Sequence, residues 1–208
     1  MDAKTTTTPP TPEFGDPLAP QASAETIALL ARRRSSSAQT LGAPGPGNDE
    51  LKLLLRLGAR VPDHGKLAPW RFIVLQQPAK AELVRRFEAI AVAREDAPKA
   101  TAKLAKLSSS PLSIAVISRV TGGGDIPEWE QELSSGAVCT MLLTAAAALG
   151  YGANWITDWY AYDPACCAIL GLGSGERVAG IVHIGTPAEA PLERARPDVE
   201  QITRYWAG

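Results

Sequence analysis

Apolar side chains return every three or four positions over much of the chain, which is the spacing of helices with one buried face. Ser23 and Asn48 stand directly before two such segments, and both residue types cap helices by accepting a hydrogen bond from the first turn. Gly150 follows the longest segment, and glycine commonly ends a helix. The spacing predicts helices that begin at Ser23, Asn48 and Pro78, cover residues 97–107, run from Asp125 and Pro127 to Gly150, and run from Asp163 to Gly171.

Short apolar runs rich in β-branched residues predict strands. They are Arg71–Leu75, Leu112–Ser118, Asn154–Trp159 and Val178–Gly185. On this pattern alone, strands that alternate with helices favour an α/β fold with a parallel sheet. Two predicted helices precede the first strand, however, and simple alternation does not produce that arrangement.

The chain divides into a tail and one folded part. Residues 1–22 are rich in Thr, Pro and Ala and cannot bury enough apolar surface to offset the entropy of ordering. They are therefore predicted to be a disordered tail. Residues 23–208 are predicted to form a single domain, which suits a chain of 208 residues of which 45% are hydrophobic.

Charge, cysteines and histidines narrow the class of protein. The formal net charge of -1 provides no basic field for nucleic acid or an anionic membrane, so neither is predicted as a partner. The N-terminus shows no signal-peptide pattern, and the longest apolar stretch, Ala137–Leu149, is too short to cross a bilayer. Three cysteines without a CxxC pair fit a reducing cytoplasm, and two histidines exclude a histidine-rich metal site. The prediction is a cytoplasmic protein with no metal.

The end of the first predicted helix is a candidate anion site. Arg32, Arg33 and Arg34 set several guanidinium groups beside the Ser35 hydroxyl, and such a group can bind phosphate through paired hydrogen bonds. The alternative is a solvated helix end whose cations balance the helix dipole.

Two further segments combine rigid or small residues with aromatic ones. In residues 60–70 (RVPDHGKLAPW) the prolines stiffen the backbone and Gly65 allows a flat ligand to approach closely, unless the loop is only a stiff turn. In residues 150–157 (GYGANWIT) small residues beside Trp155 can form a slot for an aromatic ring, unless Trp155 belongs to the core. His183 stands in an apolar run and is predicted to be a core histidine.

In order and spacing, these segments resemble the bacterial FMN-dependent nitroreductase family, and within it the small NAD(P)H nitroreductases. The resemblance covers Ser23 to Pro187. The matching motifs are Arg33-Arg34-Ser35, Arg60 to His64, Pro69 to Phe72, Trp129 to Glu132 with Ser135 and Gly136, Gly150 to Trp155, and Val178 to Pro187.

The resemblance implies an α+β fold in which helices flank a central, mostly antiparallel sheet. This expectation replaces the prediction of a parallel sheet. It also implies an intertwined homodimer with two FMN sites at the interface. The segment of residues 1–22 has no counterpart in the core of the family.

The resemblance also implies the residues of the cofactor site. Arg33, Arg34 and Ser35 are expected to hold the phosphate and ribityl chain of FMN. Arg60 and His64 are expected to reach the flavin of the partner subunit. The expected neighbours of the flavin ring are Trp155, Ile156 and Thr157, and those of the nicotinamide are Ala145, Ala146, Ala147, Ala148, Leu149 and Gly150.

The implied activity is that of an FMN-dependent oxidoreductase with a ping-pong mechanism. It takes hydride from NADH or NADPH and then reduces a nitroaromatic, a quinone or a similar small acceptor. No side chain is expected to act as a nucleophile, and Arg60 or Lys66 is expected to stabilise the reduced ring. Ile156 replaces an arginine found in some relatives, which removes one polar contact to the flavin. The alternatives are a flavin-binding protein that is not a reductase (a carrier, sensor or flavin-consuming enzyme) and a partner-binding module without flavin.

Overall fold

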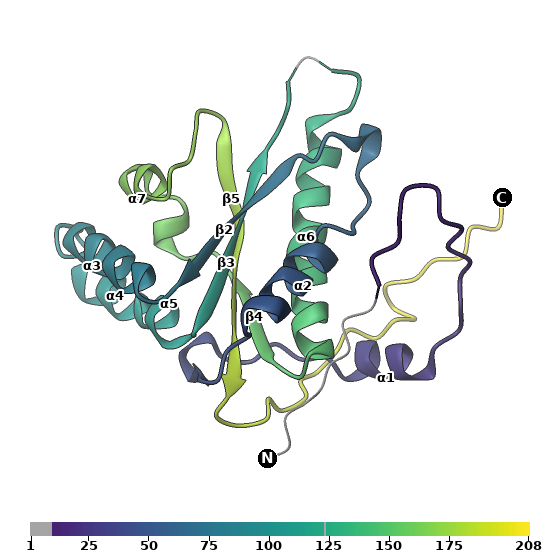
Figure 1. Ribbon diagram of the computed structural model, residues 1–208, viewed down its shortest axis with the longest axis horizontal. Helices are drawn as coiled ribbons and strands as arrows, with labels where there is room; N and C mark the ends of the chain where they lie inside the picture. The colour runs from purple at the N-terminus through teal and green to yellow at the C-terminus, as the bar shows by residue number, and fades with distance from the viewer. Residues whose placement is uncertain (1–9, 123) are drawn as a thin grey trace.

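The structure is a computed structural model that describes residues 10–122 and 124–208 (Figure 1). Its strands form a five-stranded sheet with the order β1-β5-β3-β2, in which β4 also pairs with β5. Every pairing among the described strands is antiparallel. The strands are β1 (Leu41–Gly42), β2 (Trp70–Gln76), β3 (Leu112–Arg119), β4 (Gly152–Ile156) and β5 (Glu176–Pro187).

The antiparallel sheet confirms the fold that the resemblance implied, and the parallel sheet that alternation favoured is wrong. The connection between β2 and β3 gives the reason. The last residue of β2, Gln76, lies opposite the first residue of β3, Leu112. Several helices lie between these two residues, but they return the chain to the end of the sheet that it left.

Helices cover both faces of the sheet (Figure 1). On one face α2 packs against the long helix α6, and a Cβ at Gly58 would lie 2.8 Å from Leu142, so the glycine permits this close approach. On the other face lie α3, α4, α5 and α7, while α1 stands apart from the sheet and buries none of its residues. The helices are α1 (Ala24–Arg32), α2 (Asn48–Gly58), α3 (Ala79–Ala91), α4 (Ala97–Lys103), α5 (Ala105–Ser109), α6 (Glu128–Ala148) and α7 (Pro164–Ile169), with short 3-10 turns η1 (Ala38–Thr40), η2 (His64–Lys66) and η3 (Trp159–Ala161).

Two bounds differ from the sequence prediction for local reasons. The helix predicted over residues 97–107 is interrupted at Leu104, which ends α4 and precedes α5. The strand predicted over residues 154–159 instead ends at Ile156. There the Asp158 side chain accepts a hydrogen bond from the backbone N–H of Trp159 and starts a 3-10 turn.

The sheet divides the core into two layers because strand side chains alternate between its faces. Along β5, Val182 and Ile184 pack towards α2 and α6 together with Leu54 and Leu142. Ile181 packs towards the other helices together with Phe87, Leu107 and Tyr160. These side chains fix β5, and with it the strand that borders the candidate site.

Residues 10–22 and the last residues of the chain run on the side of the molecule where α1 lies, away from the sheet (Figure 1). Residues 10–22 and 188–208 contain no helix or strand, and residues 1–9 of the predicted tail lie outside the described residues. None of the described helices is both long and apolar enough to cross a membrane. The large apolar side chains exposed on α1 and these end segments are Phe14, Leu18, Ile27, Leu30, Leu192, Val199, Ile202, Tyr205 and Trp206.

Candidate functional site

The arginine segment after α1 lies along β4. The backbone N–H of Ser36 donates to the carbonyl of Ala153 at 3.0 Å, and the Asn154 side chain donates to the carbonyl of Ser36. Arg34 is held from the other side, since its Nε donates to the carbonyl of Leu192 at 3.0 Å. These contacts fix the path of the chain from Arg33 through Ser35 beside the sheet.

A cavity of about 280 Å³, here called the arginine cavity, opens between this segment and the end of α6. Three guanidinium-bearing residues meet a backbone turn that contains two glycines, Gly150 and Gly152. Such a concave site with several cations suits a phosphate group. The lining residues are Leu29, Arg32, Arg33, Arg34, Ser36, Ala147, Gly150, Tyr151, Gly152, Pro187 and Pro191.

The segment expected to receive the nicotinamide divides between the core and this cavity. Ala145, Ala146 and Leu149 are buried. Ala147 and Gly150 line the arginine cavity, and Ala148 is exposed on α6. A ligand at this end of α6 can therefore reach only part of the expected set.

The loop that carries Arg60 and His64 lies near the opposite end of α6. The Asp63 carboxylate accepts hydrogen bonds from the backbone N–H groups of Leu67 and Ala68, at 3.1 and 2.9 Å. His64 Nδ1 lies 2.6 Å from the Glu130 carboxylate on α6. Arg60 and His64 are both exposed. The loop therefore presents a cation and an imidazole to the outside of the molecule.

The backbone of this loop is strained. Gly65 has a φ of 72°, and the two non-glycine residues Lys66 and Ala68 have φ values of 55° and 45°. Residues with a Cβ rarely adopt this left-handed region, and such strain concentrates at binding and catalytic sites. The observation favours the binding interpretation of the loop over a simple turn.

One chain does not bring the two groups of predicted residues together. The arginine cavity includes Ala147, and His64 contacts Glu130. With a rise of 1.5 Å per residue, these two positions on α6 are about 25 Å apart. Within one chain, Arg33 and His64 therefore lie towards opposite ends of α6.

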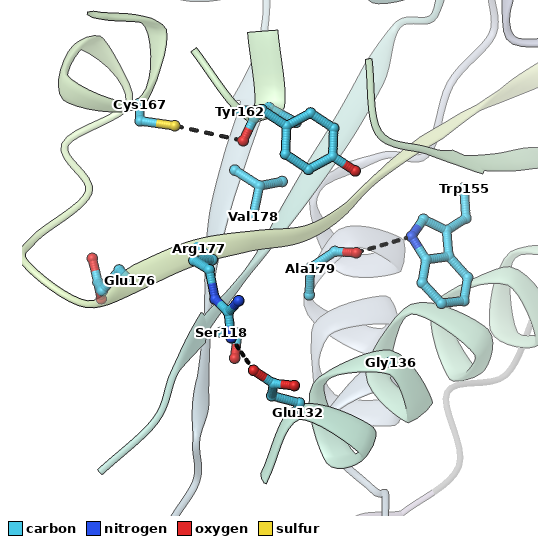
Figure 2. A pocket seen from close by; sticks show the side chains of 11 residues that line it. Ser118, Glu132, Gly136, Trp155, Tyr162, Cys167, Glu176, Arg177, Val178 and Ala179 are labelled. Atoms are coloured by element: carbon cyan, nitrogen blue, oxygen red, sulfur yellow. Dashed lines mark hydrogen bonds and ion pairs between the residues drawn. The ribbon is translucent and has the colours of Figure 1, made fainter. Parts of the chain in front are cut away.

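Trp155 forms one wall of a second cavity, of about 500 Å³, here called the Trp155 cavity (Figure 2). It opens beside the first part of β5, because β4 ends at Ile156 opposite Ile181 and leaves that edge uncovered. Val178 and Ala179 of β5 line the cavity, together with Gly136 on α6. A volume of this size is typical of sites for small organic ligands.

The indole of Trp155 is fixed against β5. Its Nε1–H donates to the carbonyl of Ala179 at 3.3 Å (Figure 2). The ring lies so close to Gly180 that a Cβ there would be 1.9 Å from Nε1. Trp155 is still 37% exposed, so one side of the ring faces the cavity instead of the core. This placement favours the slot interpretation of the segment.

The sequence reasoning missed other residues around the Trp155 cavity. Tyr162, which follows η3, donates its hydroxyl proton to Thr157 Oγ1 at 2.7 Å. Arg177 at the start of β5 pairs with Glu132 on α6. Both stand directly before predicted elements, the helix from Asp163 and the strand from Val178, but only the pairing of β4 with β5 reveals that they meet Trp155.

A buried polar cluster lies on the other face of the sheet. Lys80 Nζ donates to the Ser110 carbonyl, Ser110 Oγ and Ser113 Oγ at 2.7, 2.9 and 2.6 Å. The His183 Nδ1 atom lies 2.9 Å from Ser113 Oγ. Burial lowers the pKa of Lys80 to about 7 and that of His183 to about 3. His183 is fully buried and neutral, as predicted for a core histidine.

Among the described residues, neither the cysteines nor a group of metal-binding side chains forms another candidate site. Burial raises the pKa of the Cys139 and Cys166 thiols to about 12, so both stay protonated. Cys167 is half-buried and lines the Trp155 cavity. Within residues 10–122 and 124–208, no three His, Cys, Asp or Glu side chains form a group that could hold a metal.

Comparison with known proteins agrees with this fold. Residues 30–186 match the sequence profile of the Nitroreductase family. The chain is 30% identical over 184 residues to "Putative NAD(P)H nitroreductase YdjA" of Escherichia coli K12, covering 88% of this chain and 100% of that protein. It is also 30% identical to a protein of similar name from Haemophilus influenzae, covering 87% and 99% of the two chains.

Two solved structures resemble this chain along their full length. A nitroreductase-like protein of Bacillus cereus has a TM-score of 0.79 and 24% identity, with 91% of this chain and 100% of that one covered. A nitroreductase of Bacteroides fragilis, solved with bound FMN, has a TM-score of 0.67 and 21% identity, with 88% and 100% covered. From the family profile and these relatives, the chain belongs to the nitroreductase family.

Proposed function

We propose that the protein is an FMN-dependent oxidoreductase that takes hydride from NADH or NADPH and reduces a small acceptor. Its family supports this, as do the names of the two bacterial relatives and the FMN bound in the Bacteroides fragilis nitroreductase. In the overall reaction, one hydride and one proton convert a nitro group to a nitroso group and water, or a quinone to a hydroquinone.

The observation that carries the proposal is the arrangement of two different sites along β4. Gly152 lines the arginine cavity, and Trp155 lines the Trp155 cavity. At about 3.3 Å per strand residue the two positions are about 10 Å apart. A ligand with an anionic group and a flat ring joined by a short chain fits cations at one end and an aromatic wall at the other. FMN has this composition.

The chain's own residues would bind and orient the cofactor. Arg33, Arg34 and Ser35 would hold the phosphate and ribityl chain, and Trp155 would form a wall beside the ring. Tyr162 fixes the hydroxyl of Thr157, which would lie near the ring edge. When bound, FMN supplies the group that accepts hydride and gives it up again.

Positive charge beside the ring would come from the loop of residues 60–70. Arg60 or Lys66 would stabilise negative charge there; both side chains are exposed, and Lys66 itself stands in the strained part of the loop. His64 would reach the same flavin, with its imidazole oriented by Glu130.

The protein is further proposed to be an intertwined homodimer with FMN at the interface. Support comes from the separation of about 25 Å along α6 between Ala147 at the arginine cavity and Glu130 beside His64, which a second chain would bridge. The exposed apolar side chains of α1 and the end segments, such as Ile27 and Trp206, would be buried on that chain.

The assignment of residues 23–208 to one domain stays a prediction.

Two measurements test the proposal. The visible spectrum of the protein, and of the supernatant after heating, should show released oxidised flavin with the mass of FMN. A colourless protein that does not retain added FMN would contradict the cofactor and favour a partner-binding module. Bound flavin that NADH and NADPH both fail to reduce without oxygen would favour a flavin carrier or sensor instead.

Mixing two variants with damaged FMN sites tests whether each site is built from two chains. Arg34→Ala and Arg60→Ala damage different halves of the proposed flavin site. If each site is built from two chains, unfolding and refolding the variants together should restore FMN binding to about a quarter of all sites, because half of the dimers are mixed and each holds one intact site. No restoration would contradict the shared site.

A further inference from the structure

Two charged residues stand side by side at the rim of the Trp155 cavity and are held very differently. Glu176 accepts hydrogen bonds from Arg71 at 2.7 and 2.6 Å and from the backbone N–H of Gly173 at 2.7 Å. These donors hold the pKa of Glu176 down to about 2. Glu176 is therefore a fixed charge whose oxygens are already engaged.

Arg177, its neighbour, is held loosely. Its side chain is 69% exposed and pairs through Nη2 with Glu132, which is itself 33% exposed. A guanidinium has five N–H donors, so one contact leaves donors for a ligand. Exposed ion pairs contribute little to stability, and a competing anion can replace the Glu132 carboxylate.

Two further arginines, Arg71 and Arg119, lie near this end of the cavity. Arg119 lies opposite Glu176 in the β3–β5 pairing, and its charge also lowers the pKa of Glu176. Of these three arginines Arg177 lines the cavity, whereas Arg71 is already paired with Glu176 and Arg119 donates to the Ala68 carbonyl. A negative group that enters the cavity can therefore bind Arg177 in place of Glu132.

The other end of the cavity is aromatic. Figure 2 shows Trp155 and Tyr162 on one side of the cavity and Arg177 with Glu132 on another. The geometry points to an electron acceptor whose aromatic ring packs against Tyr162, beside the flavin ring at Trp155, while its carboxylate or sulfonate binds Arg177. Arg177 is then the specificity-determining residue. This inference rests on the proposed function, because the acceptor must lie beside the residues proposed to contact the flavin.

The test measures reoxidation of the reduced protein by two acceptors that differ in charge. The protein with bound FMN is reduced without oxygen and mixed with 4-nitrobenzoate or with neutral 4-nitrobenzyl alcohol. The measured quantity is the ratio of the two second-order rate constants. Arg177→Gln should lower this ratio about tenfold, the low end for loss of a hydrogen bond to a charged group. Arg177→Lys should restore part of it, and Glu132→Gln should raise it.

Arg85→Gln is the matched control. Arg85 is an exposed arginine paired with Glu82 on α3, on the other face of the sheet, and its loss should leave the ratio unchanged. An unchanged ratio in Arg177→Gln, with normal flavin reduction and reoxidation, would overturn this inference but leave the proposed function standing. A slower reduction by NADPH with an unchanged ratio would overturn it too and assign Arg177 to the donor phosphate. Failure of the unaltered protein to reduce both acceptors would overturn the proposed function as well.

Discussion

Replacing Gly180 by alanine should displace Trp155. The added Cβ would lie 1.9 Å from Nε1 and 2.3 Å from Cδ1 of the indole. Favourable contacts between heavy atoms lie at about 3.5 Å or more, so the ring must move by roughly 1.5 Å. That movement breaks the 3.3 Å hydrogen bond to the Ala179 carbonyl. The ring has free space on the cavity side, so it can move without unfolding β4.

The size of the effect follows from these two losses. Overpacking in a protein interior costs about 1–3 kcal/mol, and a lost hydrogen bond costs about 0.5–1.5 kcal/mol. Because Trp155 is 37% exposed and can relax, we expect a fall of about 1–2 kcal/mol in the free energy of unfolding. If Trp155 is the wall beside the flavin ring, FMN binding should weaken roughly tenfold, which corresponds to about 1.4 kcal/mol.

Urea unfolding and FMN titration measure the two effects. Gly42→Ala is the control, since Gly42 is also a strand glycine and a Cβ there would meet nothing within 4 Å. If Gly180→Ala keeps the stability, the tryptophan fluorescence and the FMN affinity of the wild type, the fixed position of Trp155 is refuted. Altered fluorescence with unchanged FMN affinity would refute only its role at the flavin.

Three other predictions follow from single contacts. Arg34→Ala should weaken FMN binding by about 1.5–3 kcal/mol if the guanidinium binds the phosphate, and an unchanged FMN titration would remove it from the site. Tyr162→Phe frees the Thr157 hydroxyl, so the absorption spectrum of bound flavin should change while the free energy of unfolding falls by only about 1 kcal/mol; an identical spectrum would place Thr157 away from the ring. Burial lowers the pKa of Lys80 from 10.5 to about 7, so between these pH values the unfolded chain binds the extra proton and stability rises with pH. The difference in unfolding free energy between wild type and Lys80→Met should therefore shift in favour of wild type as the pH rises, and a flat difference would mean that Lys80 keeps its proton when folded.

The elements of the fold could be predicted from local pattern, but their directions could not. β3 is buried on both faces, and its middle residues, Ile114–Ile117, form an apolar run that is easy to recognise. Nothing in that run says that Leu112 pairs with Gln76, which is what makes β2 and β3 antiparallel. That information lies in the geometry of the connecting helices. Only the resemblance to a family supplied it.

For the candidate site, too, some residues could be predicted from the sequence and others could not. Arg33 and Trp155 stand in segments whose composition already suggested a phosphate and a ring. Tyr162 and Arg177 carry no such signal, because their roles arise from the place where β4 ends and β5 stays uncovered. The neighbourhood of His64 and Glu130 likewise depends on how the loop packs on α6.

Reduction of the bound flavin by NADH or NADPH in the absence of oxygen tests the central claim most directly. We expect the visible absorbance of the oxidised flavin to disappear with one equivalent of donor per flavin, and to return when a nitroaromatic or a quinone is added. A protein that holds FMN but keeps its absorbance with both donors would contradict the assignment as an NAD(P)H-dependent oxidoreductase.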